Sequence, residues 1–208
     1  MTNPAWLGWL QQIQALAQDG LAYSQNPFDI ERYQALTAIA AKITGTYGGV
    51  DFETVQATFA NEAGYATPKL DVRGVVFEGS RLLMVRELSD GHWTMPGGWV
   101  DVGEPLSKAV EREVQEESGY EVKAVKVLAI FDRNSSRHRH PPFIFHLYKI
   151  FVLCQLTGGK PSSSIETDGA NFFSMDEIPP LSTARTTLPE IELMFTHLRE
   201  PDRPMDFD

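Results

Sequence analysis

The sequence has little cysteine, no long apolar run and no excess of positive charge. Cys154 is the single cysteine among 208 residues, so no disulfide can form within the chain. No apolar run approaches the roughly 18 residues that a membrane-spanning helix requires. The formal net charge is −10, whereas a nucleic-acid-binding surface needs a basic stripe to contact phosphates. These absences argue against disulfide-stabilised, membrane-spanning and general DNA-binding proteins.

The start of the chain also lacks the marks of a secretory signal. MTNPAWLGWLQQIQALAQDG has neither a basic start nor a continuous apolar stretch. The lone Cys154 lies in the apolar run HLYKIFVLCQL, which is typical of an inert core thiol. Both features favour a cytosolic protein in a reducing environment.

Residues 1–66 are predicted to form a small all-α N-terminal domain. Apolar residues recur there at helical spacing, and three helix starts are expected, near Pro4, Asp29 and Asp51. Helices of this length bury little surface by themselves. We expect them to pack on the second domain, on a second copy of the chain, or on both, with Trp6 and Trp9 in those contacts.

Residues 67–208 change to an α/β pattern. Two β-rich runs flank Glu78-Gly79-Ser80, which is a hairpin signal. Residues 105–118 are predicted as a helix, with Pro105 in its first turn and Gly119 at its end. Three further strands are expected at 121–131, 143–155 and 170–174. A last helix is expected at 188–198, followed by a frayed tail at 200–208.

One run, GWVDVGEPLSKAVEREVQEESGY, carries the clearest chemical signal. It fits the spacing G-x5-E-x7-R-E-Φ-x-E-E-x-G-Φ, where Φ is a hydrophobic residue. The matching positions are Gly98, Glu104, Arg112, Glu113, Glu116, Glu117, Gly119 and Tyr120. We call this run the box.

The carboxylates of the box predict a metal site. On a helix, Glu113 and Glu117 lie on one face about one turn apart, with Glu116 beside them. Such a cluster repels itself without a cation, and its oxygen ligands suit Mg2+ or Mn2+. A solvated acidic helix face is the alternative. The fixed glycines, Glu104 and Arg112 favour the metal site, with Arg112 holding carboxylates in position.

The spacing of the box resembles the signature of the Nudix hydrolases, which hydrolyse a diphosphate linked to another moiety by metal-assisted attack of water on phosphorus. The resemblance implies an α/β/α sandwich around a mixed sheet. It also makes Glu113, Glu116 and Glu117 the metal ligands, with the carbonyl of Gly98, and gives Arg112 a supporting role. Tyr120 replaces the usual aliphatic residue, which we interpret as a change in packing only.

Nearly the whole chain resembles a narrower Nudix group, which has a helical N-terminal domain and includes ADP-ribose and CDP-choline pyrophosphatases. The similar stretches are PAWLGWLQQIQALAQDGLAYSQNPFDIERYQAL, PKLDVRGVVF, DGHWTMPGGWVDVGE and FFSMDEIPPLS. This resemblance implies a homodimer built partly from the N-terminal helices. It also implies a nucleoside diphosphate joined to a small group as the substrate.

The attacking water needs a base, or a metal that lowers its pKa. Glu116 and Glu117 are candidates within the box. The resemblance adds Glu166, since many Nudix enzymes carry a catalytic glutamate in this later loop; a plain surface acid is the alternative. Asp168 is a further candidate for the same role.

Four residues are candidate substrate contacts: Arg133, Arg139, Arg86 and Trp99. The first two belong to a basic island, RNSSRHRH, between two predicted strands. A solvated turn is the alternative there, and the histidines of the island lack the partners of a zinc site. Arg86 lies on a strand whose alternation does not decide between substrate and solvent, and Trp99 follows the Gly-Gly pair as a pocket-wall candidate.

The prediction is therefore a Mg2+- or Mn2+-dependent Nudix pyrophosphatase of the ADP-ribose or CDP-choline class. The alternatives are a nucleotide-sanitising or RNA-end-processing hydrolase and a non-catalytic, nucleotide-sensing Nudix module. A sensor is disfavoured because every box carboxylate is present, and because residues 1–66 lack the basic character of a DNA-recognition helix.

Overall fold

The computed structural model describes residues 4–48, 51–135 and 137–208. The chain forms two compact units. One contains Lys69–Pro141 and Leu147–Asp208, and the other contains Thr2–Pro68 together with Pro142–His146. We call them the α/β unit and the helical unit, and describe each by itself.

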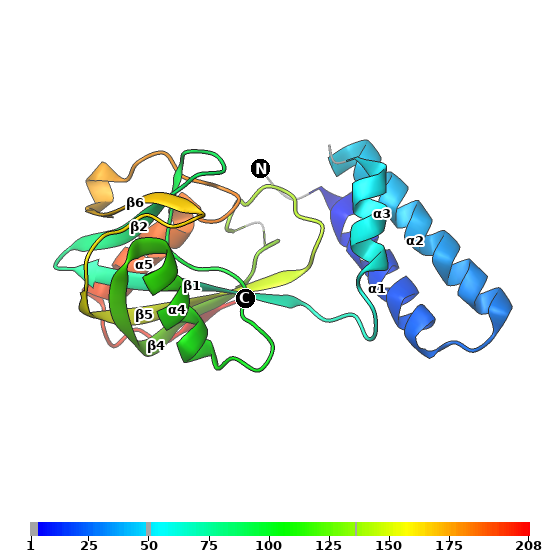
Figure 1. Cartoon of the computed structure of the whole chain (residues 1–208), viewed down its shortest axis with the longest axis horizontal. Coiled ribbons are helices and arrows are strands. Elements are labelled where there is room, and N and C mark those ends of the chain that lie inside the picture. Colours follow the sequence, from blue (N-terminus) through cyan, green and yellow to red (C-terminus); the bar gives the residue numbers. More distant parts are fainter. Residues whose placement is uncertain (1–3, 49–50, 136) are drawn as a thin grey trace. The chain divides into compact units, whose positions relative to one another are not determined.

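The helical unit contains α1 (Ala5–Tyr23), α2 (Pro27–Gly48) and α3 (Phe52–Ala60) (Figure 1). The side chain of Asp51 caps α3 by accepting hydrogen bonds from the backbone N–H groups of Glu53 and Thr54. A small core joins the three helices, formed by Leu7, Leu10, Ala40, Ala41, Val55 and Phe59. The prediction of a helical N-terminal region is confirmed.

A short segment far along the chain belongs to the helical unit. Residues 142–146 group with it, and the side-chain amide of Gln11 donates to the carbonyl of Phe143 at 3.0 Å. The strand predicted at 143–155 therefore begins later, as β5 (Leu147–Gly159). The prediction failed at this end because the partner of the segment is α1, which no local pattern reveals.

A seven-stranded mixed sheet forms the centre of the α/β unit. Its strands are β1 (Lys69–Glu78), β2 (Arg81–Glu87), β3 (Trp93–Thr94), β4 (Tyr120–Asp132), β5, β6 (Thr167–Phe173) and β7 (Asp206–Phe207). The order is β3-β2-β1-β5-β4-β7, and β6 pairs with β2. β1 and β2 form the predicted antiparallel hairpin, whereas β1 and β5 are parallel.

Two helices cover opposite faces of this sheet, α4 (Leu106–Ser118) and α5 (Leu188–Arg199) (Figure 1). Alternation along the central strand explains why, because successive side chains point to opposite faces. Val76 of β1 packs in one core cluster with Val114 of α4. Its neighbour Val75 packs in another cluster with Met194 of α5. The expected α/β/α sandwich is confirmed.

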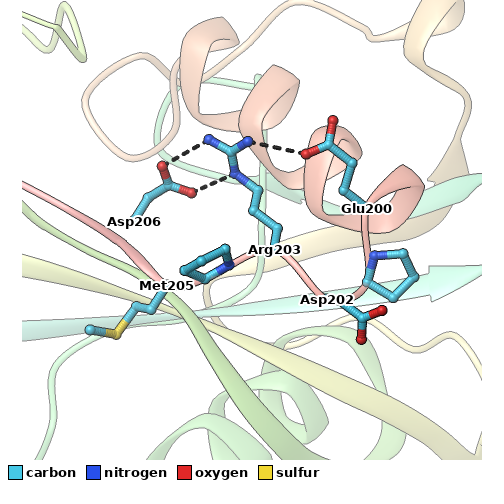
Figure 2. A pocket seen from close by; sticks show the side chains of 7 residues that line it. Glu200, Asp202, Arg203, Met205 and Asp206 are labelled. Carbon is cyan, nitrogen blue, oxygen red and sulfur yellow. Dashed lines mark hydrogen bonds and ion pairs between the residues drawn. The ribbon is translucent and has the colours of Figure 1, made fainter.

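The C-terminal tail is ordered by ion pairs, so the prediction of a frayed tail is wrong. Figure 2 shows Arg203 between the carboxylates of Asp206 and Glu200. The Nζ of Lys126 on β4 donates to the carbonyl of Pro201 at 2.9 Å. β7 then pairs with β4 in parallel. Ion pairs within the tail and contacts with the distant strand β4 together hold this segment.

A buried ion cluster links β1 to β5. The carboxylate of Asp71 accepts hydrogen bonds from Arg73 at 2.7 and 3.0 Å and from Lys149 at 2.9 Å. Burial by itself would raise the pKa of Asp71, but the two cations outweigh it and lower the pKa to about 2. All three residues are at most 5% exposed, so each charge depends on the others.

We predict that Asp71→Asn lowers the free energy of unfolding by about 3–5 kcal/mol, because two buried cations lose their counter-ion. The folded pKa lies below the unfolded value of 3.8. The contribution of Asp71 is therefore present above that value and is lost as the pH falls toward 2. Urea unfolding between pH 2.5 and 7 measures it, with the exposed Asp202→Asn as a control. Equal stabilities of the two variants at pH 7 would contradict the prediction.

Candidate functional site

The box helix α4 runs from Leu106 to Ser118, as predicted. The face of α4 that carries Ala109, Val110 and Val114 is buried in the core. The glutamates therefore lie on the other faces of the helix. The helix ends at Gly119, whose φ of 77° is left-handed. A Cβ at this position would lie 2.4 Å from the carbonyl of Lys160, so the position requires glycine.

The loop Pro96-Gly97-Gly98 is fastened to β1. The backbone N–H of Val72 donates to the carbonyl of Gly98 at 2.9 Å, and that of Gly74 donates to Pro96 at 2.8 Å. Gly97 has a φ of 147°, and a Cβ there would lie 1.9 Å from the carbonyl of Val72. The glycine therefore permits the close approach of two backbones that places the loop beside α4.

Glu117 is the buried carboxylate of the box. It is 4% exposed, and its Oε2 accepts a hydrogen bond from the backbone N–H of Gly97 at 2.9 Å. Burial raises its pKa to about 8, against the opposing charge of Arg73 and the hydrogen bond from Gly97. Ionisation of Glu117 is therefore costly in this position. A cation bound beside it would stabilise the charged form of the carboxylate.

Arg112 organises the other carboxylates. Its Nε and Nη2 donate to the two carboxylate oxygens of Glu104, at 3.0 and 2.9 Å. Its Nη1 donates to Glu113 at 2.9 Å and to Glu116 at 3.1 Å. The hydrogen bond from Arg112 lowers the pKa of Glu104, whereas burial raises the pKa of Glu113. This is the supporting arrangement that the sequence predicted for Arg112 and Glu104.

The carboxylate oxygens that lie beside Gly97 and Gly98 are of the chemical type that binds a hard divalent cation. The carboxylate of Glu113 lies against Gly98, since a Cβ at Gly98 would be 3.0 Å from both of its oxygens. Glu117 accepts a hydrogen bond from the backbone N–H of Gly97, so both carboxylates lie against this backbone and offer the oxygen atoms that such a cation prefers. Glu116 points to Arg112 and is largely exposed. Within residues 4–48, 51–135 and 137–208, no three His, Cys, Asp or Glu side chains group closely enough to hold a metal.

The predicted residues on β2 and β6 pair with each other. Arg86 donates from Nε and Nη2 to the two carboxylate oxygens of Asp168, both at 2.7 Å. Glu166 is exposed and precedes Thr167, whose hydroxyl donates to the carbonyl of Glu117 at 2.6 Å. The loop of Glu166 thus lies beside the C-terminal end of α4, while its role as a base stays a prediction.

The predicted basic island does not act as one surface. Arg133 is 3% exposed, and its guanidinium donates to the carbonyls of Pro141 and Ala184 at 2.9 and 3.1 Å. His140 is buried 2.7 Å from Glu190. Arg139 is exposed, with a left-handed φ of 57°. Arg133 is therefore bound to backbone carbonyls inside the protein, and its expected contact with substrate stays a prediction.

The aromatic and thiol predictions have mixed outcomes. Trp99 is 46% exposed next to the Gly-Gly pair, where a pocket wall was expected. Cys154 is buried in the core, and burial raises the pKa of its thiol to about 12, so the expectation of an inert thiol is confirmed. Trp9 is 65% exposed in the single chain, so its expected contact with the second domain or a second copy stays a prediction.

Two charged residues near the box escaped the sequence prediction. Glu87 ends β2 and is 1% exposed, and burial raises its pKa. Its Oε1 lies 3.0 Å from the Nε of Arg185. Glu87 closes an apolar strand and Arg185 lies in an unpatterned loop, so the sequence offered no signal that the two residues meet.

The family comparisons agree with this geometry. The NUDIX domain model matches residues 67–192, which is more than half of the chain. The chain belongs to the Nudix family. A second model, described as a UDP-X-like N-terminal oligomerisation domain, matches residues 4–59. Both regions of the Nudix protein, the helical start and the catalytic domain, therefore have counterparts in known families.

Related proteins match most or all of the chain. A Bacillus subtilis protein, provisionally named ADP-ribose pyrophosphatase YjhB, is 42% identical over 203 residues, covering 98% of this chain and 97% of its own. A Streptococcus suis ADP-ribose pyrophosphatase structure is 37% identical, with a TM-score of 0.62, and covers 68% of this chain and 100% of its own. A UDP-X diphosphatase structure is 29% identical, with a TM-score of 0.63 and complete coverage of both chains.

These likenesses make the protein a Nudix hydrolase, as the box predicted. Nudix hydrolases generally use divalent metal ions. The relatives described above are named for small-molecule diphosphates, so they give no support to the RNA-end alternative. In the described part of the Nudix chain, no helix is both long and apolar enough to cross a membrane.

We predict that Gly97→Ala lowers the free energy of unfolding of this Nudix protein by at least about 2 kcal/mol, since the added Cβ must push the loop away from β1. Gly169→Ala is the matched control, because its Cβ would make an ordinary 3.8 Å contact with Trp93. Its effect should stay within about 0.5 kcal/mol. Chemical denaturation measures both variants, and similar losses would refute the role assigned to Gly97.

Proposed function

We propose that the protein hydrolyses the P–O–P bond of a nucleoside diphosphate linked to a small moiety, with Mg2+ or Mn2+ as the cofactor. The observation that carries this proposal is the meeting of Glu113 and Glu117 at the Gly97-Gly98 backbone. ADP-ribose is the leading substrate because two relatives are named for it. The proposal of CDP-choline as a substrate rests on the resemblance of the sequence alone. The proposal of a cytosolic location rests on composition.

The proposed chemistry divides the work among the box residues. Glu113 and Glu117 would hold the divalent ion with the carbonyl of Gly98, and Glu116 would join them by leaving Arg112. When bound, the ion supplies Lewis-acid activation of the phosphate and of the attacking water. Glu166 accepts the proton of that water, and Arg112 keeps Glu104 and Glu113 in place.

The test is a substrate panel with Mg2+ and with Mn2+, containing ADP-ribose, CDP-choline, UDP-sugars, NADH and nucleoside triphosphates. We expect wild-type turnover of a nucleoside diphosphate derivative, and a fall in kcat of about 100-fold or more for Glu117→Gln, since one metal ligand and its charge are lost. The exposed Glu192→Gln on α5 is the control. Near-normal turnover by Glu117→Gln would end the metal assignment, and triphosphate preference would indicate nucleotide sanitising.

The helical unit supports a homodimer in this proposal. Trp9, Leu16 and Tyr23 recur every seven residues along α1, so they lie on one face of the helix. They are 65%, 67% and 71% exposed, while Leu7, Leu10 and Ala17 bury the opposite face. An apolar stripe of this kind, within a region that matches an oligomerisation domain, fits contact with a second copy of the chain.

We predict that the double substitution Trp9→Glu and Leu16→Glu converts the dimer to a monomer, because each buried charge would oppose association. Size-exclusion chromatography with light scattering measures the mass, and circular dichroism checks that α1 is retained. Ala57→Glu, at an exposed position on α3, introduces a charge outside the stripe and should leave the dimer intact. An unchanged dimer in the double variant would show that the stripe is not the interface.

A further inference from the structure

Three consecutive carbonyls in the loop before α5 are held by buried basic side chains. His140 lies 2.8 Å from the carbonyl of Thr183 through its Nδ1. Arg133 donates to Ala184 at 3.1 Å, and Lys149 donates to Arg185 at 2.6 Å. This loop is therefore fixed to the interior through its backbone, so the side chain of Arg185 projects from a rigid support.

The side chain of Arg185 is anchored at one edge and open at the other. Its Nε lies 3.0 Å from Oε1 of the buried Glu87, and the guanidinium side chain is 33% exposed. Within the described part of the chain, the guanidinium of Arg185 forms this ion pair but donates no hydrogen bond. A guanidinium held this way presents a planar fork, which is the geometry that binds phosphate oxygens in pairs.

Arg185 is also connected to the box. Its partner Glu87 lies opposite Thr167 where β2 pairs with β6. The hydroxyl of Thr167 donates to the carbonyl of Glu117 at 2.6 Å. The path from Arg185 through Glu87 and Thr167 thus reaches the end of α4, where the reaction is proposed.

The other arginines near the box have committed their donors. Arg73 binds Asp71 and the carbonyl of Met95. Arg86 is paired with Asp168, and Arg112 with three glutamates. Arg133 is buried on two carbonyls. Compared with these four, Arg185 combines a rigid backbone, partial exposure and donors that remain available to a substrate.

We propose that Arg185 binds the diphosphate of the substrate, and that Glu87 is the positioning residue that orients its guanidinium. This inference rests on the proposed function for the identity of the substrate. It assigns the phosphate contact to the loop before α5, in place of the Arg133, Arg139 and Arg86 that the sequence suggested.

The decisive experiment is calorimetric binding of pyrophosphate to the full chain, with and without Mg2+. We expect Arg185→Met to weaken binding about 10- to 100-fold, the effect of losing charged hydrogen bonds. Arg185→Lys should lie between, since lysine keeps the charge but loses the fork. Arg81→Met is the matched control: Arg81 lies at the other end of β2 and pairs with the exposed Glu78.

Glu87 is tested by a double-mutant cycle. Glu87→Gln should weaken pyrophosphate binding in the wild-type background and have no further effect in Arg185→Met, because it acts through Arg185. A merely structural role would produce the same loss in both backgrounds. Melting curves of every variant verify that the fold is intact.

Three results would overturn the proposal: no binding by the wild type, equal binding by wild type and Arg185→Met, or an equal loss in Arg81→Met. Because the probe is pyrophosphate, the result does not depend on which nucleoside derivative is hydrolysed. A protein that binds pyrophosphate through Arg185 yet hydrolyses no member of the substrate panel would refute the proposed function while leaving this site standing.

Discussion

The buried ion cluster of Asp71, Arg73 and Lys149 is the constraint on which the geometry of the site depends. Asp71 compensates both cations, which would otherwise be too costly to bury. Each cation then reaches a different loop, because Arg73 donates to the carbonyl of Met95 and Lys149 to that of Arg185. One carboxylate on β1 thereby ties together the loop that enters the box and the loop that precedes α5.

The site itself combines close backbone packing with an unfavourably buried charge. Gly97 lets the loop touch β1, and its backbone N–H donates a hydrogen bond to the carboxylate of Glu117. Burial outweighs that hydrogen bond and keeps the pKa of Glu117 near 8. A rigid scaffold is required to hold a carboxylate in such a place. The fold therefore prepares a position in which a cation would relieve an existing electrostatic cost.

Local signals explain which predictions were confirmed. The helix 105–118, the hairpin at Glu78-Gly79-Ser80 and the cap at Asp51 each depend on residues only a few positions apart. The failures share a different cause. The ordered tail relies on Lys126 and the shift of β5 on Gln11, both far away in the sequence. Periodicity carries no information about such partners.

The sequence by itself determined the family, the box helix and the carboxylates that share its surface, because spacing along a helix fixes which side chains are neighbours. Only the tertiary structure decided what each arginine contacts. Asp168 lies 82 positions from Arg86, and Ala184 lies 51 positions from Arg133. Such pairs form when strands and loops pack, and packing also brought Glu87 to Arg185. Charge alone marks an arginine as a candidate, whereas its partners in three dimensions determine whether its donors remain available.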